Sequence, residues 1–219
     1  MKKIEIIPAI LPRDFAEIAE NIELIKGFTK TVQIDICDGH FVSSFTWPYK
    51  KHDDSYEKML HEEEGLPAWQ ELDYEFDLMV DHPEKVIEDW VMVGATRIII
   101  HAEAKGDVVG AVNELIGRAE IGLAFNIDTP VEIPAGVNFI QLMGIDRVGY
   151  QGQKFDEKVI EKIRATRVKY PDLPISIDGA VSLETAPMLI AAGANRLVIG
   201  SAIFESDNPI DAIAKFKSL

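Results

Sequence analysis

The stretch TVQIDICDGHF, residues 31–41, carries polar side chains whose spacing could support chemistry. Gln33 and Asp35 alternate with apolar residues, and this two-residue period is typical of a β-strand with different side chains on its two faces. An ionised carboxylate is rarely buried without a partner, because its desolvation costs free energy. Asp35 is therefore a candidate for proton transfer or for binding a cation.

Two later apolar runs carry carboxylates in the same alternating pattern. In LDYEFDLMV, residues 72–80, Asp77 lies on the face opposite Tyr, Phe and Leu side chains. In PISIDGAV, residues 174–181, Asp178 lies on the face opposite two isoleucines and is followed at once by Gly-Ala. A fold that brings these acids together with Asp35 would create a strongly acidic site.

The elements that must position these side chains follow one rhythm along the chain. Eight short apolar runs alternate with stretches of helical periodicity, and no low-complexity tract interrupts the series. The runs are IEIIPAIL, TVQIDIC, LDYEFDLMV, TRIIIHAEA, IGLAFNID, NFIQLMGI, PISIDGAV and RLVIGSAI. Strands that alternate with helices pair in parallel through right-handed crossovers. Eight such units in 219 residues predict an α/β fold, a single-domain (β/α)8 TIM barrel over residues 1–219, whereas seven or fewer would predict an open doubly wound sheet.

A barrel of this type gives the acids a common location. Alternate residues of each strand point into the barrel, and active sites lie at the C-terminal ends of the strands. If the apolar residues face the helices, one amide and three carboxylates converge near one mouth, namely Gln33, Asp35, Asp77 and Asp178. At an effective dielectric constant of about 20, two charges ~4 Å apart repel by roughly 4 kcal/mol, so such a cluster requires a cation, a raised pKa or both. This combination marks functional sites more often than structural ones.

Glycines at the ends of the later runs predict a phosphate site. DGA at residues 178–180 and IGSAIF at 199–204 end the seventh and eighth runs, where barrels often bind phosphate on backbone amides and a short helix N-terminus. The segment DRVGYQGQKF at 146–155 follows the sixth run and could close over the same ligand. Each glycine signal is weak alone, since glycine also forms turns, but their shared position at one mouth favours a common site.

Composition restricts the partner and the compartment. The net charge of −15 argues against a nucleic acid, because binding a phosphate backbone needs clustered lysines and arginines. The single cysteine, Cys37, excludes an internal disulfide framework and fits a reducing compartment. The apolar start of the chain is too short for a signal peptide or a membrane span. We therefore expect a soluble, cytoplasmic protein that binds neither nucleic acid nor membrane.

One segment departs from the rhythm of runs and helices. KKHDDSYEKMLHEEEGLPAWQE, residues 50–71, lies between the second and third runs and is rich in acidic residues. We expect it to hold a helix, with its charges on a solvated face rather than on a binding surface.

Eight motifs carry a resemblance to a known family. In order they are PAIL at 8–11, DICDGHFV at 35–42, DLMV at 77–80, HAEA at 101–104, FNIDTP at 125–130, GYQGQKF at 149–155, IDGAV at 177–181 and GANRLVIGSAIF at 193–204. In these motifs and their spacing, the chain resembles the ribulose-phosphate 3-epimerases over nearly its whole length. The resemblance implies a barrel of the ribulose-phosphate-binding type, and an isomerase that inverts C3 of D-ribulose 5-phosphate, D-xylulose 5-phosphate or a close analogue.

The resemblance also implies roles for single residues. Asp35 and Asp178 occupy the positions of two catalytic aspartates, one removing a proton and the other delivering one to the opposite face through an enediolate. The residues expected to bind substrate and its phosphate are Gly149, Tyr150, Gln151, Gly152, Gln153, Gly179, Ala180, Gly200 and Ser201. Further substrate contacts are expected from Ala9, Met79 and Met143.

The expected metal ligands depart from the family pattern. The family binds a divalent metal with two histidines and two aspartates, whereas the histidine positions here read Gln33 and Asp77. Together with Asp35 and Asp178 they offer only oxygen, which suits Mg2+ or Mn2+ better than Zn2+. The competing expectation is a site without metal, in which Asp77 is protonated or turned toward a basic neighbour and hydrogen bonds hold the enediolate.

Three other interpretations stay open at this point. A decarboxylase or synthase on the same barrel would carry DxKxxD at the end of the third strand, which here reads DLMVDH. An epimerase or isomerase for another phosphosugar, such as a hexulose 6-phosphate, fits the altered pocket. Retention of both Asp35 and Asp178 argues against the third, a non-catalytic phosphosugar-binding barrel. In each case the partner is a small phosphosugar, and we expect a homo-oligomer.

His40 and His101 each have two possible roles. Each could donate a hydrogen bond to substrate or, equally, His40 could be a loop histidine and His101 a core histidine.

Overall fold

The computed structural model describes residues 4–50, 54–150 and 152–219, and eight parallel strands close into one barrel. The strands are β1 (Glu5–Ile10), β2 (Thr31–Cys37), β3 (Asp73–Met79), β4 (Arg97–His101), β5 (Glu120–Phe125), β6 (Phe139–Met143), β7 (Ile175–Asp178) and β8 (Arg196–Ile199). Each strand pairs with the next along the chain, and β8 pairs with β1. The predicted single-domain TIM barrel is confirmed, and each of the eight apolar runs overlaps one strand.

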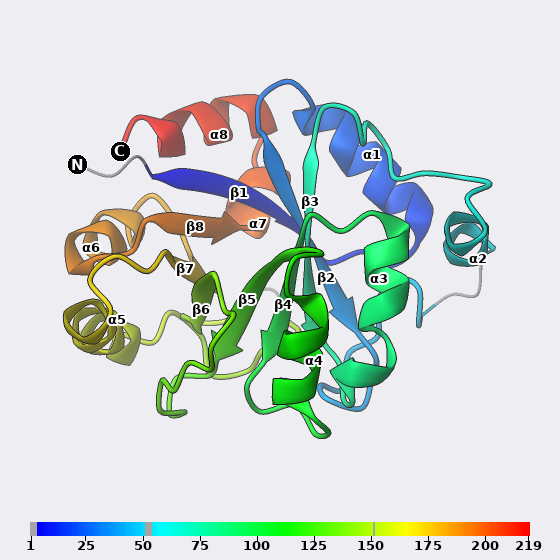
Figure 1. Ribbon diagram of the computed structural model, residues 1–219. Helices are drawn as coiled ribbons and strands as arrows, with labels where there is room; N and C mark the ends of the chain where they lie inside the picture. The colour runs from blue at the N-terminus through cyan, green and yellow to red at the C-terminus, as the bar shows by residue number, and fades with distance from the viewer. Residues whose placement is uncertain (1–3, 51–53, 151) are drawn as a thin grey trace.

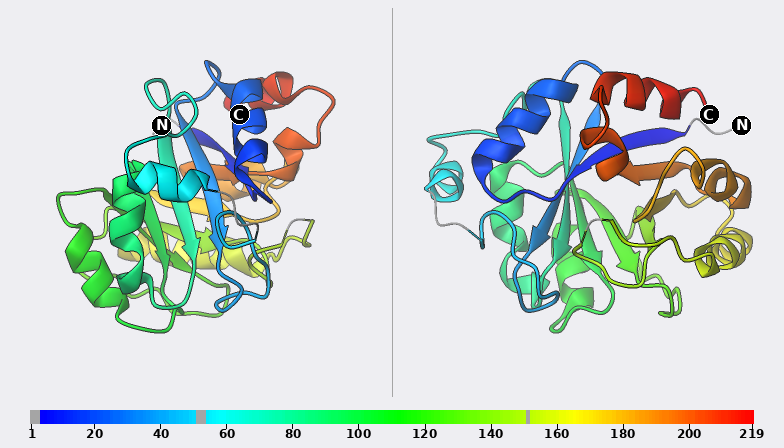
Figure 2. Two further views of the ribbon diagram at one scale, coloured as in Figure 1. Left: turned by 90° about the vertical axis from the view of Figure 1, so that its right-hand side faces the viewer. Right: turned by 180° about the vertical axis from the view of Figure 1, so that it is seen from behind.

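Helices surround the barrel and cover its outer face (Figure 1, Figure 2). The helical elements are α1 (Phe15–Ile25), α2 (Ser55–Leu60), the 3-10 turn η1 (Pro83–Lys85), α3 (Ile87–Val93), α4 (Val108–Leu115), α5 (Lys158–Lys169), α6 (Ala186–Ala192), α7 (Ser201–Phe204) and α8 (Pro209–Lys217). Among the residues that the structure describes, no helix is long and apolar enough to cross a membrane.

The connection between β5 and β6 differs from the regular rhythm. Residues 126–138, all of which are described, form a loop without a helix. Pro130 and Pro134 lie in this segment, and each lacks the backbone N–H that a helix interior requires. The lysine side chain of Lys162, on α5, donates to the carbonyls of Asn126 and Thr129 and so holds the loop against the barrel wall.

Local sequence explains where α1 begins and ends. The side chain of Asp14 accepts a hydrogen bond from the backbone N–H of Glu17, which satisfies a donor that a helix leaves free in its first turn. Ile18 and Ile22 recur at helical spacing and are buried against the barrel. After the helix, Gly27 adopts a φ of +81°, a left-handed conformation that glycine reaches without steric cost.

The main core lies between the strands and the helices. The apolar residues of β2, Val32, Ile34 and Ile36, are fully buried there, as the alternation predicts. Truncating a buried isoleucine such as Ile34 to alanine is expected to cost about 2–5 kcal/mol, because transfer free energy is lost and a cavity remains. The same outward packing of β2 directs its alternate residues into the barrel.

The acidic segment after β2 holds the expected helix, α2, although residues 51–53 lie outside the described part of the chain. In Figure 1, α2 lies at the right-hand edge, outside the ring of helices. Trp47 anchors this excursion, because its ring packs edge-on against Tyr56 of α2 and Trp90 of α3. The excursion therefore packs on the barrel's flank rather than over its mouth.

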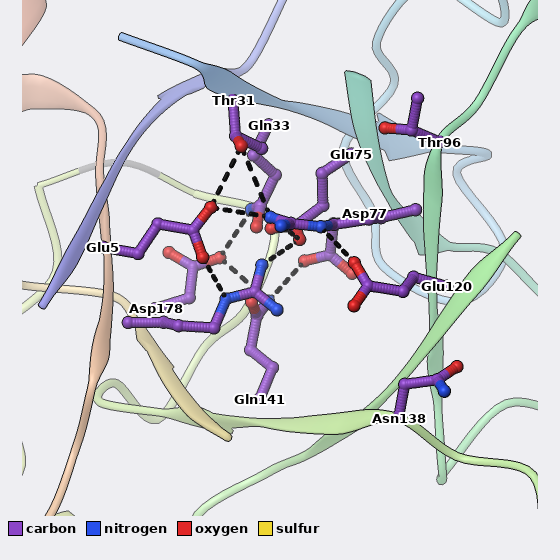
Figure 3. Close-up of polar contacts among 12 residues, drawn as sticks. Glu5, Thr31, Gln33, Glu75, Asp77, Thr96, Glu120, Asn138, Gln141 and Asp178 are labelled. Carbon is purple, nitrogen blue, oxygen red and sulfur yellow. Dashed lines mark hydrogen bonds and ion pairs between the residues drawn. The ribbon is translucent and has the colours of Figure 1, made fainter. Parts of the chain in front are cut away.

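Charged side chains form a network of ion pairs at the N-terminal end of the barrel, in which Figure 3 labels Glu5, Glu75 and Glu120. Arg196, at the start of β8, forms a buried ion pair with Glu75 and lies 3.9 Å from the centroid of the Phe139 ring. Arg97 Nη1 lies 2.8 Å from Glu5 Oε1. Burial raises the pKa of Glu75, and the charge of Arg196 partly offsets this effect. These ion pairs fill the N-terminal end of the barrel and lie beneath the acid cluster.

Candidate functional site

A pocket opens at the C-terminal ends of the strands and is lined by most of the residues that the sequence singles out. The predicted residues that line it are Ala9, Asp35, Met79, Met143, Gly149, Tyr150, Gly152, Gln153, Asp178, Gly179, Ala180, Gly200 and Ser201. Leu11, Ile145, Val181 and Val198 complete the lining. Gln151 lies outside the described residues.

Strand register places two of the acids at the same height. Asp35 on β2 is the direct partner of Asp77 on β3, because the two strands pair without a bulge. On the other side of the barrel, Asp178 ends β7 and pairs with Met143 of β6. Carboxylate oxygens of the three aspartates all lie within 4.8 Å of one another. The predicted convergence of the three acids at one mouth is therefore seen in the structure.

The acids differ in their access to the pocket. Asp35 and Asp178 are half-buried and line it, whereas Asp77 and Gln33 are completely buried and do not. The site therefore has two levels: two carboxylates face a ligand, and a third carboxylate lies beneath them with Gln33.

Two glutamine amides connect the three carboxylates (Figure 3). Gln33 Nε2 donates to Asp35 Oδ1 at 2.8 Å and to Asp178 Oδ2 at 3.1 Å. Gln141 Nε2, from β6, donates to Asp77 Oδ2 at 3.0 Å and to Asp178 Oδ2 at 3.3 Å. Each amide thus bridges two acids, and both amides share one oxygen of Asp178.

His101 supports the cluster from β4. Its Nε2 lies 3.0 Å from Asp77 Oδ1, and both side chains are completely buried. Burial opposes a positive charge on this ring, but the charge of Asp77 and the hydrogen bond to it raise the pKa of His101 above its ordinary value. His101 therefore acts as a basic neighbour of Asp77 inside the core, while His40 lines a separate surface depression with Tyr49.

The electrostatics of the cluster follow from burial and mutual repulsion. Burial, together with the charges of Asp178 and Asp77, raises the pKa of Asp35 well above its ordinary value. Burial and the charge of Asp77 raise the pKa of Asp178 to about 7, although hydrogen bonds from Gln33 and from the Gly179 backbone oppose this. A carboxyl group whose pKa lies near neutrality, as that of Asp178 does, suits general acid and base catalysis.

The cluster also has the composition of a site for a hard divalent cation. Asp35, Asp77 and Asp178 offer three carboxylates close together, and oxygen ligands suit Mg2+ or Mn2+. The Oε1 atom of Gln33 is buried without a hydrogen-bond partner, so this side chain adds an amide oxygen that the described part of the protein does not engage. The donor set therefore fits such an ion, and its chemistry differs from the mixed nitrogen and sulfur sets that Zn2+ prefers.

The turn after β7 requires its small residues. Gly179 has a φ of +98°, and a Cβ atom there would lie 2.7 Å from Ile145 Cγ1. The next residue, Ala180, has a φ of +53°. Residues other than glycine rarely adopt this left-handed backbone conformation, and it often marks functional sites. A Cβ atom on Gly144, after β6, would lie 2.4 Å from the Gly179 carbonyl oxygen. The two turns therefore meet backbone to backbone at the pocket wall.

The eighth strand leads directly into a short helix at the same wall. Gly200 precedes α7 and carries no capping side chain, so the first backbone N–H groups of the helix lack partners within it. Gly200 and Ser201 line the pocket beside the turn at Gly179. The residues predicted to bind phosphate therefore line one pocket, and their binding of an anion stays a prediction.

An apolar layer bounds the pocket on the side of β2 and β3. The buried residues Cys37, Met79 and Met143 pack together, and Val148 of the loop after β6 packs on them. Phe41, in the loop after β2, joins this group and lies against the His101 ring with centroids 4.9 Å apart. Cys37 is completely buried, so it contributes to packing.

Gln141 is the member of the cluster that the sequence analysis missed. It lies in NFIQLMGI two residues before the inward-facing Met143, so the alternation that identified Gln33 applies to it equally. His101 was left open between two roles because nothing in its local sequence indicates that Asp77 lies across the strand pair.

Comparison with known proteins places this sequence among a single group of relatives. The model of the ribulose-phosphate 3 epimerase family matches residues 5–204. A ribulose-phosphate 3-epimerase of Bacillus subtilis (strain 168) is 32% identical, with 98% of this chain and 98% of the relative covered. The ribulose-phosphate 3-epimerase, cytoplasmic isoform, of Oryza sativa subsp. japonica is 29% identical over 97% of this chain and 92% of its own length.

Solved structures support the same architecture. The 3-hexulose-6-phosphate synthase from Salmonella typhimurium superposes with a TM-score of 0.67 over 98% of this chain and 97% of the other. Its sequence is only 12% identical, so this similarity concerns the fold alone.

Proposed function

The chain belongs to the ribulose-phosphate 3-epimerase family, and from this premise we propose that it inverts C3 of a phosphorylated ketose by proton transfer between two aspartates. The observation that carries the proposal is that Asp35 and Asp178 line one pocket together with the backbone turns suited to a phosphate. D-ribulose 5-phosphate and D-xylulose 5-phosphate are the proposed substrate and product, in keeping with the names of the relatives.

The positions of the two aspartates support a two-base mechanism. Asp35 comes from β2 and Asp178 from β7, and β1 and β8 separate these strands in the barrel. The two carboxylates therefore approach a ligand in the pocket from different walls. In the proposed reaction one carboxylate removes the C3 proton, the electrons of the C–H bond form the C2–C3 enediolate, and the other carboxylic acid returns a proton to C3 from the opposite face.

The raised pKa values of the two acids suit this exchange. The reaction requires one carboxylate and one carboxylic acid at the same time, and burial favours the protonated form of each group. Gln33 bridges the two groups and restrains their separation. A singly protonated pair near neutral pH supplies the base and the acid together.

The enediolate oxygen requires stabilisation, because a proton next to a ketone is otherwise too weakly acidic. The proposed holders of a divalent cation are Asp35, Asp77, Asp178 and Gln33. When bound, such an ion would offset negative charge on the enediolate. The chain itself contributes hydrogen-bond donors to the carboxylates and, through Met79 and Met143, an apolar wall that limits water.

Substrate positioning depends on the far side of the pocket. We assign the phosphate to the backbone of Gly179, Ala180, Gly200 and Ser201, with Gly149, Gly152 and Gln153 lining the pocket beside it. This side lies away from the acids on β2 and β3, so the phosphate can anchor the sugar while C3 meets the carboxylates.

The direct test is turnover with a panel of ketose phosphates in 2H2O. We expect interconversion of D-ribulose 5-phosphate and D-xylulose 5-phosphate with deuterium entering at C3. Faster turnover of a hexulose 6-phosphate would assign the alternative epimerase or isomerase activity, which the altered ligand set at Gln33 and Asp77 favours as the second candidate. Binding without turnover or exchange in any of these sugars would leave only a phosphosugar-binding role and contradict the proposal.

Location and assembly complete the proposal. We propose a cytoplasmic homo-oligomer that acts on a small phosphosugar. The name of one relative as a cytoplasmic isoform supports the location. The net charge of −15 argues against a nucleic acid as the partner. Cell fractionation tests the compartment. Sedimentation analysis of the purified protein tests the assembly, and a mass of a single chain would contradict it.

A further inference from the structure

Gln141 has contacts that its place in an apolar strand does not explain. Its side chain is completely buried inside the barrel, and its Nε2 donates to Asp77 and to Asp178. These acids come from β3 and β7, whereas Gln141 belongs to β6. A single amide therefore joins carboxylates from two other strands.

We propose that Gln141 is a positioning residue that holds the Asp77 and Asp178 carboxylates in their working arrangement. This inference rests on the proposed epimerase function, because Asp178 is one of its two proton-transfer groups. Gln141 does not line the pocket, so it acts on a ligand only through the acids that it contacts.

The shared oxygen of Asp178 shows how the restraint works. Asp178 Oδ2 accepts from Gln141 at 3.3 Å and from Gln33 at 3.1 Å, so two amides on different strands fix the same atom. The carboxylate cannot turn about its bond to the chain without losing both hydrogen bonds. Because Asp178 lines the pocket, this pair of donors, together with the Gly179 backbone, restrains the direction of its carboxylate toward a bound sugar.

The oxygen of the Gln141 amide lacks a partner, which indicates that the NH2 group is the functional part of this side chain. Gln141 Oε1 is buried without a hydrogen-bond partner, so the polar contacts of the side chain come from its NH2 group. A buried polar atom without a partner costs free energy, and an apolar side chain of equal length would fill the same volume without that cost. The amide is therefore explained by what it donates, and not by packing.

The test replaces the amide while keeping the shape. Gln141→Met removes both donors and retains the length of the side chain. We expect kcat for ketose phosphate epimerisation, measured per folded protein, to fall about 100-fold because the acid is displaced from its reacting geometry. KM is expected to change by less than about threefold, since the phosphate contacts are untouched. Ser176→Ala is the matched control: Ser176 is the register partner of Gln141 on β7, its buried Oγ has no partner, and its loss is expected to leave kcat unchanged.

A second variant guards against misfolding of the first. Gln141→Asn keeps the amide but shortens the side chain by one methylene, so the donor no longer reaches both acids, and kcat is expected to fall while folding is retained. A merely structural role predicts a lower melting temperature with unchanged kcat per folded protein. That result, in either folded variant, would overturn the proposal.

Crystal structures of the variants separate this inference from the proposed function. Displacement of the Asp178 carboxylate by more than about 0.5 Å in Gln141→Met, with no displacement in Ser176→Ala, supports positioning whatever reaction the protein catalyses. Carboxylates that remain in place overturn it. Failure of the wild-type protein to turn over any ketose phosphate would contradict the function alone.

Discussion

Asp35 and Asp77 are register partners on adjacent strands, yet only Asp35 lines the pocket. Asp77 accepts hydrogen bonds from Gln141 and lies against His101 in the core, whereas Asp35 accepts from Gln33 and keeps partial exposure. Two carboxylates at one height of the barrel thus have different access to a ligand. Asp35 can therefore contact a substrate, whereas Asp77 can act only by supporting the other acids.

This difference gives the first prediction. Asp35→Asn and Asp178→Asn each keep the shape of the side chain but cannot carry a proton between solvent and sugar. Each is expected to lower epimerisation by at least about 100-fold, because a positioned general acid or base contributes about 10²- to 10⁴-fold. One variant should still exchange the C3 proton of one epimer with deuterium, as the remaining carboxylate can complete a half-reaction.

The control for this pair is Asp128→Asn, because the Asp128 side chain is 82% exposed and is not among the residues that line the pocket. Nuclear magnetic resonance of the sugar follows both epimerisation and exchange. Wild-type turnover in either active-site variant would exclude the two-base assignment.

Strand alternation was sufficient to predict the acid cluster. In a closed barrel, burial of every second residue against the helices fixes the direction of the others, so Gln33, Asp35 and Asp178 could be placed from local sequence. Hydrogen bonds between strands are different in kind. The contacts of Gln141 with Asp77 depend on which strands face one another and on side-chain rotamers, and the sequence around Gln141 contains neither.

Loop structure shows the same limit. The glycines at 149, 179 and 200 each follow the end of a strand, and all three line the same pocket. The helix expected between the fifth and sixth strands does not form, and the loop there is held instead by Lys162. Periodicity alone predicts a helix in this segment, whereas Pro130 and Pro134 lack the backbone N–H that a helix interior needs.

The second prediction concerns the phosphate. Gly200→Val places two methyl groups beside the first N–H groups of α7 and is expected to weaken calorimetric binding of a ketose phosphate by at least about tenfold. Gly200 has a φ of −92° and a ψ of −93°, so the affinity comparison is made only after the melting temperature shows that the variant is folded. Gly65→Val, on the exposed loop after α2, is the matched control. Equal affinity in the two variants would contradict the placement of the phosphate.

The third prediction is a dependence of stability on pH in the presence of a chelator. Burial raises the pKa of Asp178 to about 7 and that of Asp35 in the same direction, whereas an aspartate in an unfolded chain titrates near 4. Between these values the folded state binds more protons than the unfolded state. The two carboxyl groups therefore contribute fully to the free energy of unfolding below about pH 4. This contribution is lost as the pH rises through their pKa values in the folded protein.

Urea unfolding between about pH 5 and pH 8 measures this effect. The free energy of unfolding of the wild-type protein is expected to fall over this range. The side chain introduced by Asp178→Asn cannot ionise, so the fall in unfolding free energy of this variant should be smaller than that of the wild type by on the order of 2 kcal/mol. Asp128→Asn should keep the wild-type slope, because that carboxylate is exposed. A slope for Asp178→Asn equal to that of the wild type would refute the link to this carboxyl group.

The fourth prediction is that a metal in this site is a hard ion. Asp35, Asp77 and Asp178 provide only carboxylate oxygens, and Gln33 adds an amide oxygen, so Mg2+ or Mn2+ should bind in preference to Zn2+. Binding would also relieve repulsion of roughly 4 kcal/mol for each close pair of acids. Metal analysis of the purified protein and calorimetric titration with each ion measure this preference directly. Asp77→Asn is expected to weaken binding of the ion, because it removes a charge beneath the pocket.

Activity after chelation decides between the hard ion and the site without metal. With a hard ion, activity should disappear on chelation and return with Mg2+ or Mn2+ more fully than with Zn2+. Full activity in excess chelator would instead favour the site without metal, for which the contact between Asp77 and His101 already supplies the basic neighbour. Stoichiometric zinc held by these four side chains would defeat the hard-ion prediction, because it would show that an all-oxygen set selects the ion that usually prefers nitrogen and sulfur.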